Sequence, residues 1–242
     1  MVRGIMRSTI DKIRRSLAIR GFMGTAAMCA VNLVSTFDLE ARRVETERQE
    51  SDATFDEEWN VDTGGIYRPK ESEVSGENWA HGVRYQAVDA TVLRATLKGL
   101  AINFSDFTFV DFGSGKGRAL LIASEFGFKR IIGIEYCADL NRIAAENLRR
   151  HFKAARRDSI ELITSDAATV ALPEGPLVLY LFNPFSRAVM SRVVQNATDS
   201  FRQNPRRIVV VYFTPYDADL WEATGFLKRL KDSPALFDTG TV

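Results

Sequence analysis

The stretch that decides the fold lies at residues 109–118 and reads FVDFGSGKGR. Its apolar start predicts a buried β-strand, and its glycines predict a tight turn that opens a helix over about 118–126. Glycines allow the backbone to adopt positive φ and to approach a ligand closely. The first turn of such a helix directs free N–H groups toward that ligand. The pattern therefore predicts the nucleotide-binding corner of a doubly wound α/β sheet.

Spacing separates the glycine loops that bind different nucleotides. A phosphate-binding P-loop needs Gly-Lys-Ser/Thr after an earlier glycine, and Gly117 stands where the hydroxyl residue would be. A dinucleotide loop reads G-x-G-x-x-G, whereas this loop reads G-x-G-x-G. Asp111 at the end of the strand would repel a pyrophosphate, but it suits a ligand with an amino group and a sulfonium.

The pattern hydrophobic-Asp-x-Gly-x-Gly-x-Gly resembles motif I of the class I S-adenosylmethionine (SAM) methyltransferases. The resemblance implies that SAM is bound by Asp111, Gly113, Ser114, Gly115 and Gly117. It also implies a doubly wound, mostly parallel, Rossmann-like sheet of seven strands, preceded here by an N-terminal helical extension. Lys116 and Arg118 are interpreted as solvated or helix-start side chains without a chemical role.

Two more acids follow predicted strands. Glu135 ends the apolar run 130–135, about as far beyond the loop as nucleotide folds carry the acid that binds the ribose hydroxyls. Asp166 and Ala167 follow a predicted strand at 160–164, where these methyltransferases carry an acid for the adenine amino group. Asp166 has a second interpretation, as the N-cap of a helix. All these groups follow the carboxyl ends of strands, where open α/β sheets bind ligands.

A fourth predicted strand, 177–182, runs into Asn183-Pro184-Phe185. This resembles the [Asn/Asp]-Pro-Pro-aromatic motif of amino-methylating enzymes. The resemblance implies that Asn183 borders the cofactor and holds a target nitrogen, and that Phe185 stacks on the substrate. Because the chain has one proline here, Phe185 falls one place early, and a core position is its alternative. An oxygen acceptor would require a general base, for which His81 is the candidate.

Composition fits a globular enzyme. The 242 residues are 45% hydrophobic, and the net charge of +1 argues against general nucleic-acid binding. Two histidines provide no metal-ligand cluster, and two cysteines provide no disulfide framework. We therefore expect no metal site.

The chain divides into three predicted parts: 1–50, a basic helical extension; 51–87, a loop-rich lid; and 88–242, the methyltransferase domain. In the extension, the uncharged run 21–37 is shorter than the roughly 20 apolar residues of a membrane span. Residues 1–37 therefore have three interpretations: a docking helix, a membrane-surface helix, or a signal or anchor. We expect a cytoplasmic protein, and a membrane-surface helix would place it at the inner face of the membrane.

The predicted lid carries three candidate site residues. They are Tyr67, His81 and Tyr85, and Tyr85 is the one we assign to catalysis. Their alternative role is to fix the segment to the core. In the domain, helices are expected at 89–100, 138–153, 186–203 and 217–222, and further strands at 207–213, 226–230 and, shortened, 236–237.

The sequences of several motifs are similar to those of a bacterial group of class I methyltransferases without an assigned substrate. These motifs are Asp-Thr-Gly-Gly at 62–65, His-Gly-x-Arg-Tyr at 81–85, the glycine loop, and Leu-Phe-Asn-Pro-Phe at 181–185. The resemblance implies methyl transfer but names no acceptor. We expect a nitrogen acceptor on a protein or a small molecule. The alternatives are an oxygen acceptor, a SAM-binding module without catalysis, and a Rossmann-type oxidoreductase.

Overall fold

The computed structural model of the chain describes residues 39–67, 84–152, 159–182, 184–232 and 234–240. The predictions made for residues 1–37, His81 and Asn183 lie outside the described residues.

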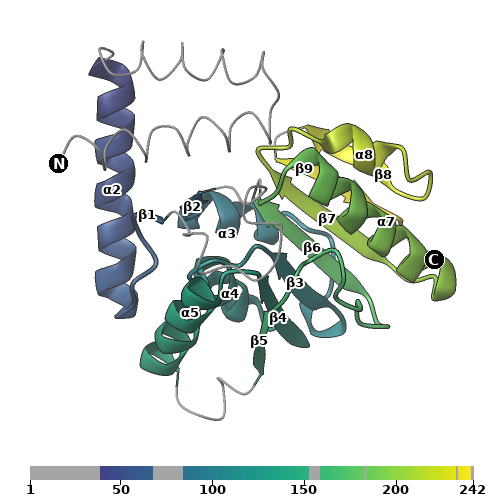
Figure 1. The fold of residues 1–242 in the computed structure, drawn as a ribbon, viewed down its shortest axis with the longest axis horizontal. Helices are drawn as coiled ribbons and strands as arrows, with labels where there is room; N and C mark the ends of the chain where they lie inside the picture. The colour runs from purple at the N-terminus through teal and green to yellow at the C-terminus, as the bar shows by residue number, and fades with distance from the viewer. Residues whose placement is uncertain (1–38, 68–83, 153–158, 183, 233, 241–242) are drawn as a thin grey trace, which may run out of the picture.

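A seven-stranded sheet forms the centre of the molecule, in the order β5-β4-β3-β6-β7-β9-β8 (Figure 1). Its strands are β3 (Thr108–Phe112), β4 (Arg130–Glu135), β5 (Ile160–Thr164), β6 (Leu177–Phe182), β7 (Ile208–Phe213), β8 (Lys228–Asp232) and β9 (Ala235–Asp238). The five strands β5, β4, β3, β6 and β7 are parallel to one another, whereas β9 runs antiparallel to β7 and β8. This confirms the predicted mostly parallel, seven-strand sheet. The strand order reverses between β3 and β6, and open α/β sheets bind ligands at such a point.

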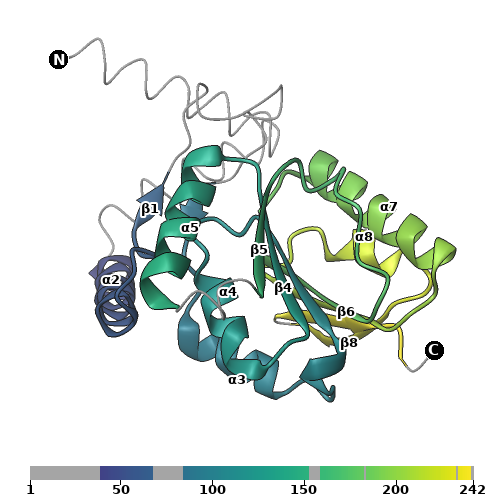
Figure 2. The same cartoon turned by 90° about the horizontal axis from the view of Figure 1, so that it is seen from below.

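Helices cover both faces of the sheet (Figure 2). One face carries α3 (Ala90–Lys98), α4 (Arg118–Ala123) and α5 (Ala138–His151), and the other carries α7 (Arg187–Gln203) and α8 (Ala218–Glu222). Side chains alternate along the strands, so Phe109 packs in the core cluster with α3 and α4, whereas Val110 packs in the cluster with α7 and α8. Because both faces are covered, the central strands are mostly apolar on both faces.

The N-terminal part of the described chain is helical for longer than the sequence predicts. Helix α2 runs from Leu39 to Trp59, and a two-stranded ribbon follows it, with β1 (Ile66–Tyr67) antiparallel to β2 (Tyr85–Gln86). The expected start of a loop-rich lid at residue 51 is wrong for residues 51–59. The helix continues because Asp52 and Phe55 are buried against the domain, which stabilises these turns.

The bounds of the two last strands differ slightly from those predicted. The predicted strand at 226–230 begins instead at Lys228, because Phe226 packs on Phe201 with ring centroids 4.1 Å apart. All five side chains of β8 are exposed, as suits a charged edge strand. The short final strand expected at 236–237 spans Ala235–Asp238.

Candidate cofactor site

The acids predicted from the sequence meet at the carboxyl edge of the sheet. Asp111 of β3 lies beside Gly133 of β4, and Glu135 ends β4 beside Thr164 of β5. The turn after β3 is tied to β4, because the N–H groups of Gly113 and Ser114 both donate to the Ile134 carbonyl, at 2.8 and 3.1 Å. The glycine loop is therefore fixed to the end of β4, next to Glu135.

The loop needs glycine for backbone reasons at three positions. Gly113, Gly115 and Gly117 have φ of +81°, +54° and +86°, values that other residues rarely adopt. The space that a Cβ would take is filled by protein: by Pro184, 2.6 Å away, at Gly113, by the Tyr85 ring at Gly115, and by Ala144, 3.2 Å away, at Gly117. These packing contacts are a second reason, beside the backbone conformation, for glycine at the three positions.

Glu135 is the organising carboxylate of the loop. Its Oε2 accepts the Gly115 N–H at 2.9 Å, and its Oε1 accepts the Cys137 N–H at 2.9 Å. The residue is 3% exposed, and burial raises the pKa of its carboxyl group to about 6, against the opposing effect of these N–H groups. At neutral pH the carboxylate is ionised and keeps acceptor positions beyond the two in use.

Asp111 is buried on β3, one of the two strands at the switch point. Burial, followed by the nearby Glu135 charge, raises the pKa of its carboxyl group well above the usual range. No described residue donates a hydrogen bond to this carboxyl group. Nearby, the Ser114 hydroxyl is also buried without a partner among the described residues. Buried polar groups of this kind are costly unless a ligand or water completes them.

The structure places Asp166 in a turn. Its Oδ1 accepts the Ala168 N–H at 3.0 Å, and its Oδ2 lies 3.4 Å from Arg192. This geometry is close to the capping interpretation, although a turn rather than a helix follows. Ala167 is buried in the core cluster beneath α7.

Phe185 lies in the hydrophobic core. The residue is 9% exposed and belongs to the cluster with Val189 and Met190 of α7. The structure thus places Phe185 at the core position, which the sequence left open as its alternative. A ring packed in this way is not placed to stack on a substrate. Its neighbour Pro184 lies against Gly113, so the segment after β6 does reach the glycine loop.

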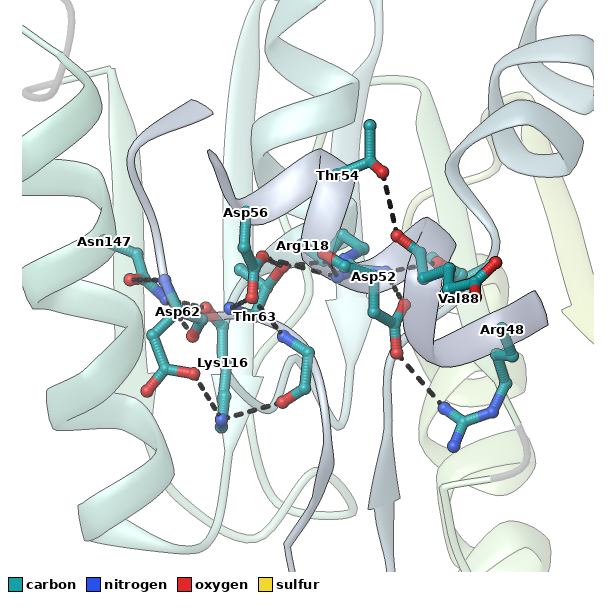
Figure 3. A network of polar contacts seen from close by, with 12 residues as sticks. Arg48, Asp52, Thr54, Asp56, Asp62, Thr63, Val88, Lys116, Arg118 and Asn147 are labelled. Carbon is teal, nitrogen blue, oxygen red and sulfur yellow. Dashed lines mark hydrogen bonds and ion pairs between the residues drawn. The ribbon is translucent and has the colours of Figure 1, made fainter. Parts of the chain in front are cut away.

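Two side chains that the sequence analysis left without a role are buried. Arg118 is 3% exposed and Lys116 is 8% exposed, so the interpretation as solvated residues is wrong. The Arg118 guanidinium pairs with Asp52 and Asp56 of α2, and its Nε donates to Thr63 Oγ1 at 2.7 Å (Figure 3). A sequence signal was present: Asp52, Phe55, Asp56 and Trp59 share one face of a helix that is otherwise charged.

Tyr85 lies against the loop, whereas Tyr67 is its partner in the ribbon. The Tyr85 ring packs on Gly115, and its hydroxyl donates to the Thr63 carbonyl at 2.6 Å. Burial raises the pKa of this hydroxyl far above its usual range, so it stays protonated. Tyr67 pairs with Tyr85 in the register of β1 and β2.

Strand order, strand direction and the glycine loop at the switch point decide the fold. This is a doubly wound, Rossmann-like α/β fold. In the Rossmann-like sheet of this chain, the switch-point strands are β3 and β6, and the loop after β3 carries the three glycines.

No family model matches the chain, and no curated protein matches it. The chain is similar to a predicted N6-adenine-specific DNA methylase from Listeria monocytogenes, with 15% identity, 63% of this chain and 51% of the other covered, and a TM-score of 0.47. It is similar to the pyocyanin biosynthetic protein PhzM, with 16% identity, 60% of this chain and 53% of the other covered, and a TM-score of 0.45. It is also similar to the 23S rRNA methyltransferase ErmE, with 16% identity, 53% of this chain and 48% of the other covered, and a TM-score of 0.41.

The chain spans about half the length of these three proteins, and likenesses of this size give no information on the acceptor.

The described residues contain no group of three or more His, Cys, Asp or Glu side chains placed to hold a metal ion. Within the same part of the chain, no helix has the length and apolar character to cross a membrane.

Proposed function

We propose that the protein is a SAM-dependent methyltransferase. The observation that carries the proposal is the pair of buried carboxyl groups, Asp111 and Glu135, on adjacent strands beside the glycine loop. Two acids at this point disfavour a diphosphate group, because like charges repel strongly where water is excluded. They favour a ligand that brings a cation and a pair of hydroxyl groups, and SAM has both.

The residues present fit the two polar ends of SAM. A carboxylate has about four acceptor positions, and the N–H groups of Gly115 and Cys137 use two of those on Glu135. The remaining positions suit the two hydroxyls of a ribose. Asp111 suits the amino group, since a cation beside it would offset the burial that raises the pKa of its carboxyl group. Ser114 supplies a further buried hydroxyl without a partner among the described residues.

SAM supplies, when bound, a methyl group that its sulfonium has already activated. The protein therefore has to align the acceptor and exclude water, and alignment can contribute about 7–11 kcal/mol at the extreme. Pro184 and the Tyr85 ring border the glycine loop on two sides. We propose that they limit the access of water there, and that Tyr85 acts through its ring rather than as a base, because its hydroxyl is already used by Thr63.

We propose a nitrogen acceptor, on a protein or a small molecule. The support is the sequence Asn183-Pro184, because an amide can orient an amine without taking its proton, whereas an oxygen nucleophile needs a base. His151 is the one histidine among the described residues. Its ring stacks on Trp59 with ring centroids 4.4 Å apart, and it has no contact with Asp111, Glu135 or the glycine loop among those described. An oxygen acceptor is the alternative, with His81 as its candidate base.

Calorimetry and a transfer assay test the proposal separately. The wild-type chain is titrated with SAM and, for comparison, with NAD; binding of SAM alone is expected. The chain is then incubated with methyl-labelled SAM and host lysate, which is fractionated into protein, nucleic acid, lipid and small molecules. Binding without label transfer would favour a SAM-binding module, and binding of NAD alone would refute the proposal.

A further inference from the structure

The end of α2 and the turn after it wrap around the start of α4. We call residues 52–64 the clasp. Arg118, the first residue of α4, donates to the clasp through Asp52, Asp56 and Thr63, and its guanidinium lies 4.7 Å from the centre of the Phe55 ring. Among the described residues, the carboxylates that pair with Arg118 all belong to the clasp. A buried guanidinium without a partner is costly, so α4 and the clasp stabilise each other.

The next contact of the clasp is with the glycine loop itself. Lys116 Nζ lies 2.7 Å from Asp62 Oδ1 and donates to the Gly64 carbonyl at 2.9 Å. Asn147 of α5 joins the same two segments, because its Nδ2 donates to the carbonyls of Lys116 and Asp62, at 3.0 and 2.8 Å, and its Oδ1 accepts the Asp62 N–H. Figure 3 shows these side chains converging on the turn after α2. The clasp thus holds the loop by main chain as well as by charge.

A third contact between the clasp and the glycine loop is made through Tyr85. Tyr85 donates to the Thr63 carbonyl of the clasp and lays its ring on Gly115. Gly115 in turn donates its N–H to Glu135. The contacts form a closed path from Gly115 through Lys116 and Arg118 to the clasp, and back through Tyr85 to Gly115.

We propose that the clasp is part of the cofactor site, with Arg118 and Lys116 as positioning residues that hold Tyr85 and the loop amides in their binding arrangement. This inference rests on the proposed function. Its consequence is that SAM affinity depends on α2, a helix that contributes no residue to the two-carboxyl site. Most side chains at positions 42–50 of α2 are exposed, whereas Asp52 and Phe55 nearer its end are buried against the domain.

The test uses isosteric changes that remove charge from the clasp. In the full chain carrying Asp52→Asn and Asp56→Asn, the Kd for SAM is expected to rise at least about tenfold, because charge-assisted bonds to Arg118 are lost. Amide hydrogen exchange across residues 113–117 is expected to quicken before SAM is added. Asp238→Asn is the matched control, since Asp238 is a similarly buried carboxylate that pairs with Arg207 in the sheet. It is expected to bind SAM as the wild type does.

A milder variant covers the case in which the double variant does not fold. Thr63→Val keeps the shape of the side chain and removes the Arg118 Nε bond, and a Kd about threefold weaker is expected. Whichever clasp variant folds, unchanged SAM affinity and unchanged exchange overturn the clasp proposal while the proposed function stands. If the wild-type chain itself binds no SAM, both proposals are wrong.

Discussion

The affinity for SAM is expected to fall on acidification, because Glu135 must be ionised to accept hydrogen bonds from a ribose. The pKa of its carboxyl group is about 6 in the folded chain, raised by burial. If only the ionised form binds, lowering the pH from about 7 to about 5 weakens the apparent affinity about tenfold, since the ionised fraction falls by that factor. Asp111 acts in the same direction, because its carboxyl group must also lose a proton to receive a cation.

Folding stability responds to the same group with the opposite sign. A carboxyl group whose pKa is raised on folding stabilises the fold while it is protonated, and this stabilisation is lost as the pH rises through about 6. The shift from 4.5 to about 6 corresponds to about 2 kcal/mol. Glu135 alone therefore makes the acidified protein more stable and a weaker binder, a combination that simple acid unfolding does not produce.

Isothermal titration with SAM between about pH 5 and pH 7, with circular dichroism at each pH to verify folding, measures the effect. Glu135→Gln is the control, because it keeps the shape of the side chain and removes its titration. The slope that remains in this variant belongs to Asp111. An affinity that stays constant over this range in the folded wild type would refute the assignment of Glu135 to the ribose.

Three further outcomes are expected. Phe185→Leu should lower the melting temperature and leave the turnover of the folded enzyme unchanged, because the ring packs in the core; a loss of turnover at full folding would restore its catalytic role. Thr214→Asn should stabilise the fold by about 1 kcal/mol, measured by urea unfolding, because Thr214 has φ of +51° and asparagine tolerates that conformation better. Deletion of residues 1–50 should preserve SAM binding because Asp52 and Asp56 remain, whereas deletion of residues 1–59 should abolish it; equal binding by both would contradict the role of the clasp.

The sequence predicts the sheet well because each strand is marked by a local pattern of residues. The runs that form β3, β4, β6 and β7 are mostly apolar, and glycine, an acid or proline lies at or just after the ligand-binding end of each. Glu135 could be found because its position relative to Gly117 follows a fixed spacing in nucleotide-binding folds.

The rest of the site depends on contacts between distant segments. Arg118 and Asp52 are far apart in the chain. The face of α2 that carries Asp52 and Phe55 indicates that this helix packs on the domain, but it does not identify Arg118 as the partner. Phe185 was ambiguous for a similar reason, because a strand end followed by proline can turn an aromatic ring toward either the core or the ligand. The ring lies in the core because α7 begins immediately after it and brings Val189 and Met190 against it.

The stack of Trp59 on His151 gives this protein a built-in optical reporter. The ring centroids are 4.4 Å apart, and His151 Nδ1 lies 3.0 Å from the Trp59 carbonyl, so the indole in the clasp rests on an imidazole from α5. Imidazole in contact with indole quenches its fluorescence, most strongly when it is protonated. Movement of the clasp away from α5 would brighten Trp59, whereas Trp221 is fully buried beneath the opposite face of the sheet. The sequence has a third tryptophan, Trp79, so a Trp79→Phe chain is the one to use. Its emission can follow the clasp in real time during a stopped-flow mixing experiment.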